Sequence, residues 1–374
     1  MKIAEIKAYP LTFIPPKPFY NSVDKHYSRS VTLIKIYSDC GTYGWGEAYG
    51  PAVAGMARII ETYIKERLIG EDPFRIEYLW HKIQTKKGLP IGVLGGVDMA
   101  LWDLKCKILG VPLYVILGGK FFDEFEPYGS GLPFKEVHPD STEELEKETL
   151  DLMSHGFKAI KMKIGFGIER DKKRITRVKE LIGDRVDLLV DANQAYNISS
   201  CLELLPFLEE MKVKWFEEPM PWHNFTSYKK LRERSNIAIA AGEQENNMQG
   251  FISAIQDQIC DIIQPDIPAV GGITPMKRIA AIAFANNIEL HPHIFGTVIS
   301  LPAALQFMCS QPNYHSWCTF KPPVMIEWDT NPNSMARKLL KEPLELTDGM
   351  VKVPDKPGFG VDINEDALEE FIVK

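Results

Sequence analysis

Short apolar runs that each end in a polar residue recur through the second half of the chain at nearly constant spacing. The polar residues at these ends lie 23 to 28 positions apart, and amphipathic stretches separate the runs. One strand and one helix occupy about this length, so the pattern predicts consecutive βα units. Six such units, with room for one at each end, favour a parallel (β/α)8-type barrel over an open sheet. The runs are 158–165, 186–193, 213–219, 237–243, 259–266 and 288–293.

The front of the chain has a different pattern. Residues 1–14 alternate apolar and polar positions, and residues 31–37 and 43–48 flank a glycine-containing turn, which indicates an antiparallel sheet. Helical periodicity follows from residue 53 to residue 117, and strands followed by helices predict an α+β domain. We therefore divide the chain into an N-terminal α+β domain (1–124), a barrel domain (125–340) and a C-terminal segment (341–374) that packs on the first domain.

The composition is that of a folded protein and excludes several partners. Of 374 residues, 45% are hydrophobic and 25% are charged, which supplies apolar material for a large core. The 43 basic and 50 acidic residues give a net charge of −7, which argues against nucleic acid as a partner. The six cysteines lack metal-type spacing, and no stretch reaches the ~20 apolar residues of a membrane span. We expect a cytoplasmic enzyme with no membrane partner.

Three of the predicted strand ends carry carboxylates. Asp191, Glu217 and Glu243 follow consecutive apolar runs, and the carboxyl ends of parallel barrel strands meet at one face. Oxygen ligands without histidine or cysteine suit a hard divalent cation, and three carboxylates leave positions open for water and substrate, which favours Mg²⁺ over zinc. Ion pairing at the barrel rim is the alternative for each acid.

Two lysines and an aspartate–histidine pair add titratable groups to the same face. Lys161 and Lys163 occupy alternate positions of one buried run, so both point the same way. We expect mutual repulsion and a nearby cation to lower the pKa of at least one of them, as an amine base requires. Asp266 and His293 end neighbouring strands, where the carboxylate can fix the histidine tautomer for acid or base catalysis.

Short motifs in a fixed order connect these residues. The front domain contributes Gly44-Trp45-Gly46-Glu47 and the stretch 98–104, and the barrel contributes Lys161-Met162-Lys163, Asp191-Ala192-Asn193, Glu217-Glu218-Pro219, Gly242-Glu243, Gln264-Pro265-Asp266, Gly271-Gly272-Ile273-Thr274, Pro292-His293 and Glu327. Together they resemble the enolase superfamily, in its mandelate racemase/muconate lactonizing enzyme family and mandelate racemase subgroup. Because the muconate-cycloisomerase subgroup carries a lysine where this chain has Asp266, lactone-forming and N-acyl amino acid isomerases are disfavoured.

The resemblance implies an architecture and a cofactor. It implies a capping domain over a modified (β/α)7β barrel, completed by the C-terminal segment, with Mg²⁺ held by Asp191, Glu217 and Glu243. The ion would hold a small-molecule carboxylate and make the proton α to it removable through an enediolate. Glu218, which strand alternation sends away from Glu217, is implied to be a supporting or ion-pair residue.

The resemblance also implies the catalytic roles. Lys163 is the base on one face of the substrate, and His293, oriented by Asp266, is the acid or base on the other. The residues implied to contact the substrate or its carboxylate are Lys161, Asn193 and Glu327.

One enediolate permits two reactions. If His293 protonates a β-hydroxyl leaving group, the enzyme is an acid-sugar (aldonate or aldarate) dehydratase that gives a 2-keto-3-deoxy acid. If His293 reprotonates the α-carbon, the enzyme is a racemase or epimerase of a 2-hydroxy acid. The subgroup's use of this pattern favours dehydration, which is an analogy of fold. A non-catalytic barrel relative is a remote alternative, against which the complete set of ligands and bases weighs.

Substrate choice is expected to depend on loops 15–29 and 49–55. Polar side chains in the first loop favour a polyol acid over an aromatic one, and among them we predict that Tyr20 and His26 bind substrate; exposure to solvent is the alternative. Relatives of this kind are often homo-oligomers. The polar side chains are Tyr20, Asn21, Asp24, Lys25, His26, Tyr27 and Arg29.

Overall fold

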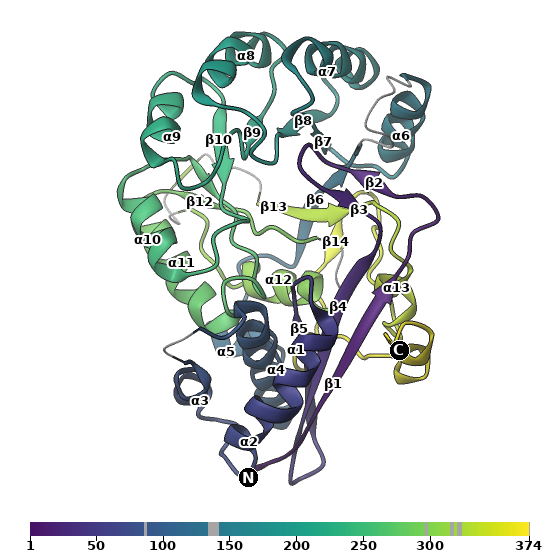
Figure 1. The fold of residues 1–374 in the computed structure, drawn as a ribbon, viewed down its shortest axis with the longest axis vertical. Helices are drawn as coiled ribbons and strands as arrows, with labels where there is room; N and C mark the ends of the chain where they lie inside the picture. The colour runs from purple at the N-terminus through teal and green to yellow at the C-terminus, as the bar shows by residue number, and fades with distance from the viewer. Residues whose placement is uncertain (86–87, 134–141, 296–297, 315–317, 320–323, 374) are drawn as a thin grey trace.

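A parallel sheet of eight strands forms the centre of the molecule. The computed structural model describes residues 1–85, 88–133, 142–295, 298–314, 318–319 and 324–373 (Figure 1). Parallel pairing runs from β13 through β6 and then in chain order to β12. The strands are β6 (Glu124–Gly131), β7 (Ala159–Lys163), β8 (Asp187–Asp191), β9 (Trp215–Glu217), β10 (Ala238–Ala241), β11 (Ile262–Ile263), β12 (Glu289–Leu290) and β13 (Met325–Asp329).

A helix of at least eight residues follows each strand from β6 to β12, whereas the five-residue α13 (Ser334–Lys338) follows β13, so the order of elements in the barrel is (β/α)7β. Beyond β12 the described residues contain no ladder to β13; instead the Met325 backbone N–H donates to His291 Nδ1 at 3.2 Å. The modified barrel predicted from the sequence is confirmed. The helices are α6 (Thr142–Ser154), α7 (Ile168–Ile182), α8 (Ile198–Glu210), α9 (Phe225–Arg232), α10 (Met248–Gln256), α11 (Ile273–Ala285) and α12 (Ser300–Met308).

An α+β domain covers the barrel at one end, and we call it the capping domain. Its antiparallel sheet has the order β1-β4-β5, and the small β2–β3 hairpin reaches up to the barrel beside β7 and β8 (Figure 1). Ser22, in the hairpin turn, donates to the Ala192 carbonyl at 2.6 Å, which fixes the hairpin over this end. The elements are β1 (Ile3–Phe13), β2 (Phe19–Tyr20), β3 (Lys25–His26), β4 (Arg29–Ser38), β5 (Tyr43–Ala48), α1 (Val53–Ile59), a π-helix (Ile60–Ile64), α2 (Lys65–Leu68), α3 (Ile76–Ile83), α4 (Ile91–Leu109) and α5 (Leu113–Leu117).

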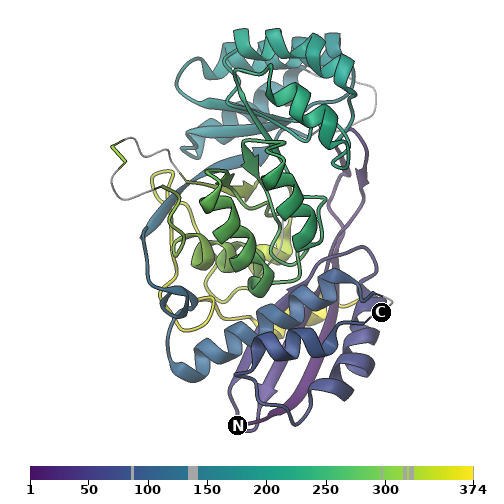
Figure 2. The ribbon, with the colours of Figure 1, turned by 90° about the vertical axis from the view of Figure 1, so that its left-hand side faces the viewer.

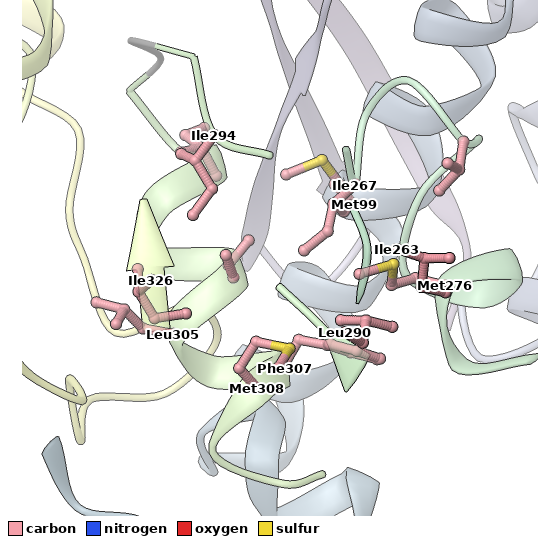
Figure 3. Close-up of a cluster of buried hydrophobic side chains, with 14 of the residues drawn as sticks. Met99, Ile263, Ile267, Met276, Leu290, Ile294, Leu305, Phe307, Met308 and Ile326 are labelled. Atoms are coloured by element: carbon pink, nitrogen blue, oxygen red, sulfur yellow. The ribbon is translucent and has the colours of Figure 1, made fainter. Parts of the chain in front are cut away.

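Helix α4 lies directly on β5 because the strand carries glycines. A Cβ atom on Gly46 would come 1.9 Å from the Gly96 carbonyl oxygen, so only glycine allows this approach. The other side of α4 joins the barrel: Met99 belongs to the same buried cluster as Ile263 and Ile267 (Figure 3). The capping domain and the barrel therefore share one apolar core.

Two acids of the capping domain also cap barrel helices. Asp98 of α4 accepts hydrogen bonds from the Thr274 backbone N–H at 2.9 Å and from Thr274 Oγ1 at 2.6 Å, in the first turn of α11. The helix's own N-cap is Gly272, which has no side chain to do this. Glu47 likewise accepts from the Ile299 backbone N–H at 2.7 Å, at the N-cap of α12. A carboxylate at a helix N-terminus is stabilising, so these contacts join the two domains.

We expect the Asp98→Ala substitution to lower the free energy of unfolding by about 1–3 kcal/mol, because it leaves two buried donors of Thr274 without an acceptor. Urea denaturation followed by circular dichroism measures the change. The Asp98→Asn protein keeps one acceptor oxygen and should lose less. An Asp98→Ala protein that unfolds at the wild-type urea concentration would show that this cap does not stabilise the fold.

The C-terminal segment contacts both domains. Its strand β14 (Val351–Lys352) pairs antiparallel with the start of β6, and the Thr12 backbone N–H donates to the Phe371 carbonyl at 2.8 Å. Lys35 of β4 pairs with Glu365 at 2.5 Å, and Figure 2 shows the C-terminus beside the capping domain. These contacts support the predicted packing of the C-terminal segment. The domain boundaries at 124/125 and 340/341 stay a prediction. The segment contains β14 and a 3₁₀-helix (Glu365–Glu370), and α13 (Ser334–Lys338) precedes it.

Within the described ranges, no helix combines the length and the apolar character that a membrane crossing requires.

Candidate active site

Parallel register brings three carboxylates to the same end of the barrel. Lys163, Asp191 and Glu217 are partners across β7, β8 and β9, and Glu243 follows β10 by two residues. One carboxylate oxygen of each acid lies within 4.8 Å of the other two. Asp191 and Glu217 are buried, and the Glu243 side chain is 10% exposed. The predicted convergence of these acids is present in the structure.

Lys161 holds two of the surrounding acids together in the interior. Its ammonium lies 2.6 Å from Glu217 Oε1 and 2.9 Å from Glu327 Oε1, and its side chain is 1% exposed. Burial alone would lower the pKa of Lys161, but the two carboxylates outweigh it and raise the pKa well above its ordinary value. Burial opposes ionisation of Glu327 as well, yet Lys161 and His293 lower its pKa to about 2. Both groups are therefore charged.

Glu217 has further donors behind it. Trp215 Nε1 lies 3.1 Å and Gln264 Nε2 lies 2.9 Å from its Oε2 atom. Burial, together with the negative charges of Asp191 and Glu327, nevertheless raises the pKa of Glu217 to about 7. A buried cluster of acids with this surplus of negative charge is stabilised by a cation.

Lys163 donates to Asp191 from the neighbouring strand. Burial lowers the pKa of Lys163 and so does Lys161, but the charge of Asp191 outweighs both and raises it. The expectation of a lowered lysine pKa included a nearby cation and stays a prediction for the metal-bound protein. The sequence pattern showed the repulsion between two lysines on one strand, but it could not give the distance from each lysine to the acids.

His293 and Asp266 form the predicted dyad. His293 Nδ1 lies 2.9 Å from Asp266 Oδ2, and its Nε2 lies 3.2 Å from Glu243 Oε2. Burial lowers the pKa of His293, but Glu243 and Asp266 outweigh it and raise the pKa to about 10. β12 precedes His293 and β7 ends in Lys163, with four strands between them in the sheet order. The two side chains therefore come from well-separated strands of the barrel.

A pocket of about 130 Å³ lies between the barrel mouth and the capping domain. Lys163, Asn193, Glu243 and His293 line it from the barrel, whereas Lys161 and Glu327 lie outside its wall. Tyr20 and His26 line it from the capping domain, together with Asn21 and Asp24 of the same predicted polar loop. Further lining residues are Phe19, Val23 and Tyr49 from the capping domain and Gly131, Pro133, Gln244, Phe295 and Asn331 from the barrel.

Arg29, which the sequence interpretation placed among the pocket residues, instead lies behind the wall. It forms a buried ion pair with Asp329, and its guanidinium lies 3.8 Å from the centre of the Phe295 ring. The Phe295 ring stacks at 6.2 Å on that of His293. Arg29 thus contacts the barrel loop that carries His293. A pairing between residues 300 positions apart has no periodic signal in the sequence.

Glu218 and Asn193 have positive φ angles next to the acid cluster. Glu218 (φ 38°) is buried, and neither of its carboxylate oxygens has a hydrogen-bond partner among the described residues, so the expected ion pair is absent there. Asn193 (φ 42°) donates through Nδ2 to Glu243 Oε1 at 3.3 Å, while its buried Oδ1 has no partner in the described part of the chain. Asn193 also lines the pocket.

The residues present fit a hard divalent cation. Within the described ranges, Asp191, Glu217 and Glu243 form the one group of three acids, histidines or cysteines close enough to share a metal ion. All three offer oxygen, which suits Mg²⁺, and the cluster is negatively charged and mostly buried. The buried, unpartnered oxygen of Asn193 gives a further acceptor beside it.

The fold and this site define the class of capped-barrel enzymes, and family models give the family. The model of the mandelate racemase / muconate lactonizing enzyme N-terminal domain matches residues 6–118, and the enolase C-terminal domain-like model matches residues 144–367. The chain belongs to the mandelate racemase / muconate lactonizing enzyme family of the enolase superfamily, as the motifs predicted.

Three relatives are similar over almost their whole length. D-galactarolactone cycloisomerase of Agrobacterium fabrum is 34% identical, over 99% of each chain. The crystal structure of 3,6-anhydro-D-galactonate cycloisomerase from Zobellia galactanivorans is also 34% identical, with a TM-score of 0.88 and 100% of each chain covered. Arabinonate dehydratase of Saccharolobus solfataricus is 32% identical, over 93% of this chain and 92% of that protein.

Proposed function

We propose that this protein is a Mg²⁺-dependent enzyme that removes the proton α to the carboxylate of an acid sugar and then breaks the C–O bond at the β-carbon. The observation that carries the proposal is one pocket lined by Lys163, by His293 of the His293–Asp266 dyad and by Glu243, which belongs to the three-acid cluster. A binding protein would need neither base. The proposal retains dehydration as the preferred outcome.

Asp191, Glu217 and Glu243 would hold the ion. When bound, the ion would supply positive charge beside the substrate carboxylate, which would favour loss of the α-proton and offset the acid charge that keeps Lys163 protonated. Lys163 Nζ then takes the α-proton, since it lines the pocket directly.

His293 Nε2 faces the pocket from the other side and gives its proton to the departing oxygen, while Asp266 holds Nδ1. The raised pKa of His293, to about 10, keeps this proton in place at neutral pH. Lys161, fixed by Glu217 and Glu327, contributes a permanent positive charge behind the carboxylate. Because Glu327 is ionised and accepts from Lys161 and the Ile294 N–H, we assign it to holding Lys161.

The leaving oxygen decides between two reaction names. If it is a free hydroxyl, water is lost and the product is a 2-keto-3-deoxy acid, which is the activity of a dehydratase such as arabinonate dehydratase. If it is a ring oxygen, the same C–O cleavage opens the ring and no atom is lost, so the reaction is an isomerisation. The two cycloisomerases at 34% identity favour this second candidate. Racemisation, in which His293 protonates carbon instead, remains the third.

A panel of acid sugars tests the proposal. Open-chain aldonates and aldarates, together with their lactones and anhydro forms, are incubated with the protein and Mg²⁺, and 2-keto acid is measured. Release from an open-chain acid identifies a dehydratase, and release from a ring form alone identifies a cycloisomerase. Exchange of the α-proton in D₂O without any 2-keto acid would move the assignment to a racemase. No reaction with any member would contradict the proposal.

Removal of the metal is expected to abolish the activity. Excess EDTA should reduce turnover of the active acid sugar to background, and Mg²⁺ added beyond the chelator should restore it, because the enediolate charge is otherwise unopposed. Isothermal titration of the metal-free protein with Mg²⁺ checks the site without catalysis, and the Glu217→Gln variant should bind Mg²⁺ far more weakly. Full turnover in excess chelator would argue against a metal enzyme.

The cellular setting is part of the proposal. A cytoplasmic location is supported by the six cysteines, none of which forms a disulfide. A homo-oligomeric state rests on resemblance alone, and gel filtration with light scattering tests it.

A further inference from the structure

The distal wall of the pocket, formed by the capping domain, differs in charge from its reactive end. Tyr20, Asn21, Asp24, His26 and Tyr49 line this wall. Asp24 is its one acid, and its charge acts on both His26 and Tyr49. A substrate whose carboxylate lies beside the three-acid cluster directs its other end toward these residues.

Two cations near the β2–β3 hairpin are absent from the described lining of the pocket. Lys25 of β3 is exposed, and its ammonium lies 4.6 Å from the ring centre of Tyr20 and 4.7 Å from that of Tyr27. Arg29 is buried behind the wall in its ion pair with Asp329. Neither residue lines the pocket. Each cation is therefore engaged with other side chains of the protein.

His26 is the remaining basic group of the distal wall, and it is neutral at pH 7. Burial lowers the pKa of His26 below its ordinary value, and the charge of Arg29 lowers it further. Its ring stacks on Phe19, with centres 4.9 Å apart. Among the described residues that line the pocket, positive charge is therefore confined to Lys163 and His293 at the reactive end.

Aromatic rings provide the other part of this environment. Phe19 and Phe295 line the pocket together, with ring centres 6.4 Å apart, and Phe295 lies 5.3 Å from His26. These faces suit the C–H groups of a sugar, whereas a carboxylate placed against them would lose water without gaining a cation. The volume of about 130 Å³ limits the ligand to a small molecule.

We infer that the pocket selects acid sugars with a single carboxylate, so that the distal end of the substrate is a hydroxyl or a ring oxygen and never a second carboxylate. The inference rests on the proposed function and narrows it to aldonates and their ring-closed forms. Aldarates carry a second carboxylate, which would meet Asp24 and the aromatic rings.

Matched pairs of acids test this selectivity. Gluconate, galactonate, xylonate and arabinonate are each compared with the aldarate of the same configuration, and with the corresponding ring forms, for release of 2-keto acid. The active aldonate is expected to have a kcat/KM at least 100-fold above that of its aldarate. Equal or better turnover of an aldarate would overturn the inference and leave the proposed function standing. No turnover of any acid would overturn both.

Reversal of the distal charge gives a second test. The Asp24→Lys protein is expected to lower the aldonate preference at least 10-fold, mainly by reducing KM for the aldarate, and Asp24→Asn should have a smaller effect. Because Asp24 is exposed, these variants are expected to fold. Asp39→Lys makes the same charge change at an exposed position immediately after β4 and should leave the preference as it is. Equal effects at positions 24 and 39 would show that Asp24 does not set the selectivity.

Discussion

The Lys163→Ala protein is expected to lose about 10²- to 10⁴-fold in kcat on the active acid sugar, which is the range for loss of a general base. Lys163 lines the pocket, and its ammonium donates to Asp191, so the side chain stands between the acid cluster and the substrate. The loss should fall mainly on kcat, because the carboxylate is held by other groups. Initial rates of 2-keto acid formation, taken over a range of substrate concentrations, measure it.

Lys158→Ala is the matched control for this substitution. Lys158 immediately precedes β7 and is exposed, so its removal changes the same strand without changing the pocket. Its kcat should equal that of the wild type. Mg²⁺ titration of the Lys163→Ala protein checks that the acid cluster is intact, since the substitution removes no oxygen ligand. A Lys163→Ala protein with wild-type kcat would refute the assignment of Lys163 as the base.

The His293→Asn protein is expected to lose C–O cleavage by a similar factor, about 10²- to 10⁴-fold. His293 Nε2 carries the proton that the leaving oxygen needs, and Asp266 at 2.9 Å from Nδ1 fixes the ring. Asparagine can keep the contact to Asp266 but cannot transfer a proton at this position. Rates of 2-keto acid release measure the loss.

The control for the second substitution is His155→Asn, immediately after α6, where the histidine side chain is 55% exposed. It should have wild-type activity. If the His293→Asn protein eliminates at the wild-type rate, the acid must be another group, and the assignment of the dyad fails.

The barrel was predictable because its signal is local and repeated. Each buried strand gave an apolar run, and each run ended on a residue that now lies at the barrel mouth, so the order of Asp191, Glu217 and Glu243 followed from spacing alone. The predicted strands were longer than the observed ones: 259–266 contains only Ile262–Ile263 as β11. Beyond such strand ends the chain turns into loops, as at Gly242 (φ 132°), where ladder hydrogen bonds stop although the residues stay buried.

Contacts between distant segments could not be predicted in this way. The roles of Glu47 and Asp98 as caps of barrel helices depend on how two domains pack, and neither residue lies in a pattern that points to its partner. Packing between distant segments also produces the ion pair of Arg29 with Asp329. It likewise brings Phe295 into the pocket. The polar side chains of loop 15–29 indicated a polar pocket, whereas the observed lining combines polar groups with aromatic rings.

Exchange of the α-proton with solvent tests the central claim most directly. The active acid sugar is incubated in D₂O with Mg²⁺ and the His293→Asn protein, and the C2 proton is followed by NMR. The account predicts that deuterium enters C2 while no 2-keto acid forms, and that the Lys163→Ala/His293→Asn double variant shows no exchange. Exchange at the same rate without Lys163, or none in either protein, would contradict the removal of the α-proton by Lys163.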